Sequence, residues 1–97
     1  MKKFIVERNL PGAENLSPVE LRSLAQTFCD CAEQLEKTYV WIQSFITGDK
    51  IYCLVLAESE DIVRRHARLG KLPVNSISEV KAIIDPVTPT LLNHNAS

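Results

Sequence analysis

Hydrophobic residues recur at every third or fourth position between Leu21 and Leu35, and this period predicts a helix. The tetrapeptide S-P-V-E at residues 17–20 provides its start signal, because the Ser and Glu can form a capping box and Pro suits the first helical position. A second helix is predicted over residues 59–70, where a capping Ser precedes two acidic residues and a Gly ends the run.

Four runs rich in β-branched and aromatic residues predict strands at residues 3–8, 39–47, 50–57 and 77–84. The turn dipeptide Gly48-Asp49 joins the middle two into an antiparallel hairpin. The order βαββαβ predicts an α+β, ferredoxin-like fold of the dimeric α+β barrel type, with a four-stranded antiparallel sheet and two helices on one face. We expect one domain over residues 1–86 and a C-terminal tail over residues 87–97.

The alternation of side chains along the predicted strands leaves one face of the sheet without helices. This bare face is expected to hold large apolar side chains with a few polar ones among them. They are Trp41, Phe45, Tyr52, Leu54, Leu56 and Ile83, together with Gln43, Glu79 and Glu7. Because so much apolar surface is costly to leave in water, we expect a homodimer in which two bare faces pack together about a two-fold axis.

Composition narrows the function classes. The chain has 11 basic and 12 acidic residues, a net charge of -1, so it has no bulk attraction for nucleic acid or anionic lipid. No apolar segment reaches the length of a membrane span, and the apolar run near the start breaks at Glu7, too early for a signal peptide. Three cysteines without an export signal fit reduced thiols, and the cytoplasm is the expected location.

His66 is the first candidate for chemistry, because it falls on the apolar side of the second predicted helix. An imidazole there can bind a metal ion or carry a proton, and Glu79 and Glu7 are the acids that could share the site. The simpler interpretation is a packed histidine that is hydrogen-bonded to a carbonyl. For the two acids it is a surface ion pair with Lys81 or Arg8.

Trp41 and Tyr52 are the candidates for binding an organic cofactor or substrate, because both can stack on a flat molecule. Aromatic residues on an exposed face are also common anchors of dimers, and this is the simpler interpretation. Cys29 and Cys31 do not form a chelating pair, since residues two apart on a helix point in nearly opposite directions. The sequence lacks the motifs of the common catalytic classes.

Five blocks of the sequence together resemble the DUF4242 family of small bacterial proteins. They are F-I-V-E-R-N-L-P-G-A from Phe4, S-P-V-E-L from Ser17, V-W-I-Q-S-F-I-T-G-D-K-I-Y-C-L from Val40, R-R-H-A-R-L-G-K-L-P from Arg64 and I-S-E-V-K-A-I-I-D-P from Ile77. The resemblance implies a ferredoxin-like, dimeric protein. One branch of that family is described as nickel-responsive and nickel-binding, so the resemblance also implies a divalent metal such as nickel.

The leading hypothesis is therefore a cytoplasmic homodimer that binds a divalent metal ion through His66 with Glu79 or Glu7, with no catalysis required. The alternative is a cofactor-independent enzyme in which Trp41, Phe45 and Tyr52 hold an organic substrate and His66 moves a proton. A third hypothesis is a structural or partner-binding module without a small ligand.

Overall fold

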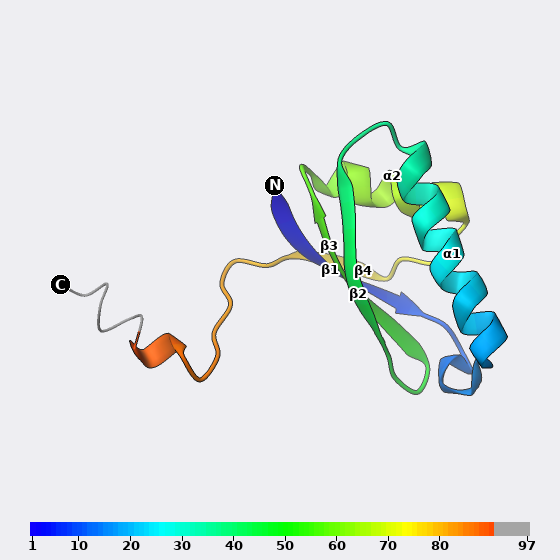
Figure 1. Cartoon of the computed structure of the whole chain (residues 1–97), viewed down its shortest axis with the longest axis horizontal. Helices are drawn as coiled ribbons and strands as arrows, with labels where there is room; N and C mark the ends of the chain where they lie inside the picture. The colour runs from blue at the N-terminus through cyan, green and yellow to red at the C-terminus, as the bar shows by residue number, and fades with distance from the viewer. Residues whose placement is uncertain (91–97) are drawn as a thin grey trace.

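The computed structural model describes residues 1–90, and its elements follow the predicted order (Figure 1). They are β1 (Lys2–Asn9), a 3-10 helix η1 (Ala13–Asn15), α1 (Pro18–Gln34), β2 (Tyr39–Ile46), β3 (Lys50–Ala57), α2 (Glu60–Gly70) and β4 (Ser76–Glu79). The strands form one sheet in the order β2-β3-β1-β4, and all neighbouring pairs are antiparallel. The predicted ferredoxin-like fold is confirmed.

The start of α1 shows how local sequence fixes an element. The Ser17 side chain accepts a hydrogen bond from the Glu20 N–H at 3.1 Å, and the Glu20 carboxylate accepts one from the Ser17 N–H at 2.9 Å. Both bonds satisfy donors that the first turn of a helix leaves free, and Pro18 needs no donor there. The predicted capping box is confirmed.

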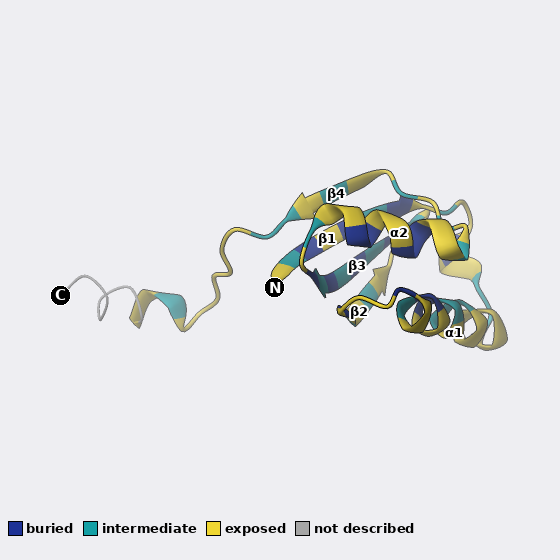
Figure 2. Cartoon of the chain, turned by 90° about the horizontal axis from the view of Figure 1, so that it is seen from above, coloured by how far each residue is buried: buried dark blue, intermediate teal, exposed yellow. Residues whose placement is uncertain are grey.

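Both helices cover the same face of the sheet, and their buried sides turn toward it (Figure 2). The core between the two layers consists of apolar side chains from every layer. It contains Phe4, Val6, Ala13, Phe28, Leu35, Tyr39, Ile51, Cys53, Val55, Ala57, Ile62 and Val63. In β3, residues alternate strictly between buried and half-buried, so one face of this strand packs on the helices and the other lies on the bare face.

A β-bulge in β2 moves Trp41 to the helix side of the sheet. Trp41 pairs with Val55, but the next register pair is Gln43 with Leu54, so Ile42 is an extra residue without a partner. The Trp41 ring packs edge-on against Phe28 of α1, with 5.1 Å between ring centroids. The predicted position of Trp41 on the bare face is therefore wrong, because one inserted residue reverses the alternation.

β4 is shorter than expected, and its side chains face the opposite sides of the sheet from those predicted. It spans Ser76–Glu79 instead of residues 77–84, and Glu79 pairs with the buried Phe4, which places Glu79 on the helix side. Its partner strand β1 begins at Lys2, which leaves little backbone for residues after Val80 to pair with. Ile83 lies beyond the strand and is 65% exposed, so its predicted place on the bare face is also wrong.

No helix among residues 1–90 is both long enough and apolar enough to cross a lipid bilayer.

Candidate functional site

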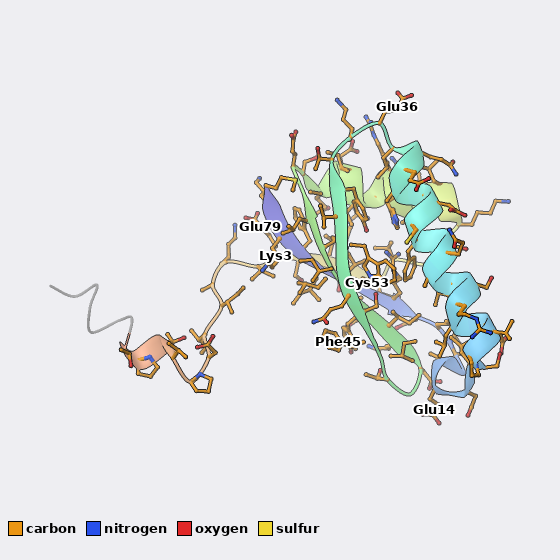
Figure 3. The ribbon with its side chains drawn as sticks, in the orientation of Figure 1. Lys3, Glu14, Glu36, Phe45, Cys53 and Glu79 are labelled. Atoms are coloured by element: carbon orange, nitrogen blue, oxygen red, sulfur yellow. The ribbon has the colours of Figure 1, made fainter. Side chains whose placement is uncertain are left out.

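The bare face of the sheet carries a patch that is mostly apolar. Its side chains come from exposed and half-buried positions of the three longest strands, on the side of the sheet away from the helices. They are Lys3, Ile5, Glu7, Val40, Gln43, Phe45, Tyr52, Leu54 and Leu56. Phe45 is 54% exposed, and it lies on the side of the hairpin away from α1, whereas Cys53 lies toward α1 (Figure 3). The prediction of a broad apolar bare face is thus confirmed for most of its residues.

An apolar hollow lies in the middle of this bare face. It has a volume of about 260 Å³, and its walls come from Ile5, Phe45, Tyr52 and Leu54, with an edge of Cys53. Tyr52, one of the two predicted stacking residues, therefore lines it, whereas Trp41 lies on the other side of the sheet. The two aromatic residues cannot hold one ligand between them.

Glu7 is the carboxylate of the bare face. It stands directly opposite Tyr52 in the register of β1 and β3, and its carboxylate lies 3.3 Å from the Lys50 ammonium. The Glu7 side chain is 29% exposed, so it is partly covered by its neighbours. The ion pair with Lys50, and not with Arg8, is what holds it in the single chain.

His66 lies between the helices and the sheet and is 1% exposed. Its Nε2 atom is 2.9 Å from the Phe28 carbonyl oxygen, and its ring stacks on Tyr39 with 4.2 Å between centroids and 12° between planes. Because a carbonyl only accepts hydrogen bonds, Nε2 must carry the proton and Nδ1 has none in the neutral ring. The simpler interpretation of His66, a packed histidine bonded to a carbonyl, is what the structure shows.

The pKa of His66 is lowered from its ordinary value. Burial is the main cause, the hydrogen bond to the Phe28 carbonyl opposes it, and the positive charge of Arg8 lowers the pKa further. The ring is therefore neutral near pH 7. Within residues 1–90, its Nδ1 atom finds no hydrogen-bond partner.

Arg8 is the unexpected member of this interior. It is 1% exposed, its Nε–H donates to the Cys53 sulfur at 3.5 Å, and its Nη1–H donates to the Pro73 carbonyl at 2.9 Å. The guanidinium also lies 5.5 Å from the centre of the Phe28 ring. No carboxylate in the part of the chain that the structure describes pairs with it, and its Nη2 atom has no partner there.

A chain of hydrogen bonds extends this polar interior to β2. The Trp41 indole donates to the Ser44 hydroxyl at 2.9 Å, and that hydroxyl donates to the Cys53 sulfur at 3.0 Å.

The burial of Arg8 is indicated by a pattern in the sequence, because Arg8 continues the period-two series of Phe4 and Val6. That series already placed the Arg8 side chain under the helices.

The three predicted metal ligands lie in three different places. His66 is in the core, Glu7 is on the bare face, and Glu79 is on the helix side at the sheet edge, 3.1 Å from the Lys81 ammonium. Among residues 1–90, no three or more His, Cys, Asp or Glu side chains are grouped closely enough to hold a metal ion. His94 lies outside the described residues. A single chain therefore does not bring the predicted ligands together.

Comparison with known proteins extends the sequence resemblance. Residues 4–80 match the model of a family described as nickel responsive protein SCO4226-like. The chain belongs to this family. The matched residues 4–80 contain both helices and all four strands of the sheet, apart from the first two residues of β1.

A solved structure shares the family's fold. It is titled the crystal structure analysis of SCO4226 from Streptomyces coelicolor A3(2), and it superposes with a TM-score of 0.72 at 18% sequence identity. The match covers 84% of this chain and 99% of that one. At this identity the likeness establishes the fold alone. No curated protein matches the chain.

Proposed function

We propose that the chain is a cytoplasmic homodimer that binds a divalent metal ion, with nickel as the first ion to test. The observation that carries this proposal is the match of residues 4–80 to a nickel-responsive family. The three free cysteines, two of them buried, agree with a reducing compartment.

The described residues of one chain do not fit nickel as a complete site, because they contain no group of three of its usual protein ligands. A two-fold contact between bare faces would double the donors on this face. Each chain supplies the Glu7 carboxylate, with Tyr52 opposite Glu7 in the register of β1 and β3. We therefore place the metal donors on the bare face, with Glu7 as the first residue to test.

His66 is a weaker choice of ligand in this fold. Its Nε2 atom already donates to the Phe28 carbonyl, and the only ring nitrogen left lies in an interior that also holds the Arg8 guanidinium. A buried cation without a carboxylate partner repels a second cation strongly in a medium of low dielectric constant. Glu79 remains a second candidate, because within residues 1–90 its carboxylate is held by a weak ion pair with the exposed Lys81.

The homodimer rests on the apolar character of the bare face. Phe45, Ile5 and Val40 are each at least 40% exposed there, and the first two also line the apolar hollow. Surface of this kind on a single chain usually marks a contact with another molecule. A self-complementary contact about a two-fold axis is the commonest way to cover it.

The alternative of a cofactor-independent enzyme loses its residue set in this structure. Phe45 and Tyr52 line the hollow, but Trp41 and His66 lie on the helix side of the sheet. A substrate in the hollow would be separated from the imidazole by the sheet itself. We therefore do not adopt this hypothesis.

The test is a calorimetric titration of metal-stripped protein with nickel, cobalt and zinc, on the wild type and on Glu7→Gln. Gln keeps the size of the side chain and removes its charge, so we expect nickel affinity to fall about tenfold or more, which corresponds to about 1.4 kcal/mol. Glu33→Gln on the exposed side of α1 is the matched control and should leave the affinity unchanged.

Two further variants locate the site if Glu7 does not. An equal loss in Glu79→Gln, with Glu7→Gln unaffected, would move the site to the sheet edge. A loss in His66→Gln alone would place it in the helix layer and contradict our assignment. Absence of binding by all three ions in the wild type would remove the proposed function.

A further inference from the structure

The chain leaves its own sheet after Val80. The Val80 N–H donates to the Lys3 carbonyl at 2.8 Å, and only Lys2 of β1 lies beyond this bond. Residues 81–85 contain neither helix nor strand, and the ribbon runs away from both layers of the domain (Figure 1). We call residues 81–87 the C-terminal arm.

The C-terminal arm is mostly apolar, and its large apolar side chains are left exposed by the rest of residues 1–90. Ile83 is 65% exposed, Ile84 is 80% exposed and Val87 is 59% exposed. The sequence K-A-I-I at residues 81–84 has the β-branched character of a strand, as the prediction of a longer β4 already indicated. An exposed run of β-forming apolar residues is a ready partner for another chain.

A defined turn ends the arm. The Asp85 carboxylate accepts hydrogen bonds from the N–H groups of Val87 at 2.8 Å and Thr88 at 3.2 Å, and the Thr88 hydroxyl accepts one from the Asp85 N–H at 2.7 Å. These hydrogen bonds form a local turn from Asp85 to Thr88 at the end of the arm. The match to the family model covers residues 4–80 and ends just before the arm.

We propose that the C-terminal arm binds a second copy of this chain along the β2 edge of its bare face, with Ile84 directed at the Phe45 end of the apolar hollow. The proposal rests on the homodimer of the proposed function and adds to it the segment that completes the contact. The hollow and the arm match in chemistry, because the hollow has apolar walls and five of the seven residues of the arm are apolar.

The size of the bare face supports a role for the arm. Strands of eight residues in a sheet three to four strands wide give a face of roughly 26 Å by 14–19 Å, or about 400–500 Å². A standard stable interface takes about 800 Å² from each partner. The arm adds a strip roughly 23 Å long when extended, or about 110 Å² at the width of one strand, so it supplies about a third of the difference.

Charge does not oppose this self-association. The chain has a net charge of only -1, and the arm contributes one Lys and one Asp, which cancel. Two identical copies therefore meet without strong repulsion, and a contact driven by apolar burial is expected to change little with salt.

The first experiment is sedimentation equilibrium of the full-length chain carrying both Ile83→Ser and Ile84→Ser. We expect the dissociation constant of the dimer to rise by about tenfold or more, since two exposed apolar side chains lose their contact. Val19→Ser is the matched control, because Val19 is 65% exposed on α1 and lies away from the bare face.

The second experiment traps the contact itself. Full-length chains with Ile84→Cys and with Phe45→Cys, both carrying Cys29→Ser, are mixed under mild oxidation and run on a non-reducing gel. We expect a disulfide-linked mixed dimer from this pair, and none when Val19→Cys replaces Phe45→Cys.

The outcomes separate this inference from the proposed function. A wild-type dimer whose dissociation constant is equal in the double Ser variant and the Val19→Ser control would overturn the arm's role and leave the dimer intact. A monomeric wild type would overturn both. Loss of nickel binding in Glu7→Gln with normal arm trapping would support both assignments independently.

Discussion

Two polar side chains in the core, Arg8 and His66, decide how the interior is charged. The guanidinium of Arg8 is positively charged. Burial lowers the pKa of the His66 imidazole and the nearby Arg8 charge lowers it further, so the imidazole is the group that stays neutral. Tyr39, which stacks on His66, stays protonated as well because burial raises its pKa. The interior therefore carries one fixed charge near neutral pH.

Stability should fall with acidity through His66. Its folded pKa is lowered, so below pH about 6.5 the unfolded chain binds a proton that the folded chain resists. The histidine's contribution is complete above that pH and is lost as the pH falls toward the folded pKa. We expect the free energy of unfolding of the wild type to fall between pH 7.5 and pH 5, measured by urea denaturation.

His66→Phe is the variant that isolates this effect. It keeps a flat ring against Tyr39 and removes the titrating group, so its stability should change less with pH over the same range. It should also be less stable than the wild type at pH 7.5 by about 1–3 kcal/mol, since the Phe28 carbonyl loses its donor. Equal pH slopes in both proteins would contradict the account, and His94 is present in both.

At the scale of elements, the sequence predicted which segments form helices and strands but not where two of them face. The capping box at Ser17 and the hydrophobic period of α1 depend on residues close together in the sequence, so they can be predicted without knowledge of the tertiary structure. The face of Trp41 depends on the bulge at Ile42, which no pattern of apolar residues marks. The face of Glu79 depends on its pairing with Phe4 in a strand more than seventy residues earlier.

The candidate site was less accessible to sequence reasoning than the fold. The sequence places His66 on the apolar side of a helix, and a packed histidine is one of the alternatives, but its neighbours come from β1, α1 and the start of β2. Which acid lies near the imidazole depends on how the strands pair and how the helices pack on them, and the pattern of residues along the chain does not specify this. Glu7 was correctly included in the bare face, because strict alternation in β1 has no bulge to disturb it.

The end of α2 offers a test of backbone strain. Gly70 closes the helix as predicted, but the residue in the left-handed region is Lys71, with φ 52° and ψ 40°. A Lys there is strained, whereas Gly is not. We expect Lys71→Gly to raise the free energy of unfolding by about 0.5–1 kcal/mol.

Lys71→Ala is the matched control for that variant. It removes the same charge but keeps a Cβ atom, so it should give no comparable gain in urea denaturation. An equal stability of the Gly and Ala variants would show that the left-handed conformation at this position is not the source of strain.

At the scale of the whole molecule, the chain has two layers and one uncovered side. The helices shield one face of the sheet, while Phe45, Ile5 and Val40 remain at least 40% exposed on the other. If dimer formation covers that side, folding and association are linked, because only folded chains present the bare face.

The melting temperature should therefore depend on protein concentration. We expect it to rise as the total concentration increases from ~1 to ~100 µM, since a larger share of the folded chains is then held in the dimer. Differential scanning calorimetry measures this directly. A melting temperature that is constant over this range would indicate that the folded chain gains nothing from a second copy.

The position of Trp41 on the helix side of the sheet also determines which events its fluorescence can detect. It is the single tryptophan of the sequence, and its indole is enclosed by Phe28 and bonded to Ser44 on the helix side. Its fluorescence is therefore a built-in label for the contact between helix and sheet, and unfolding will shift its emission. Events on the bare face are screened from it by the sheet, so an optical titration there needs a second reporter, such as Phe45→Trp.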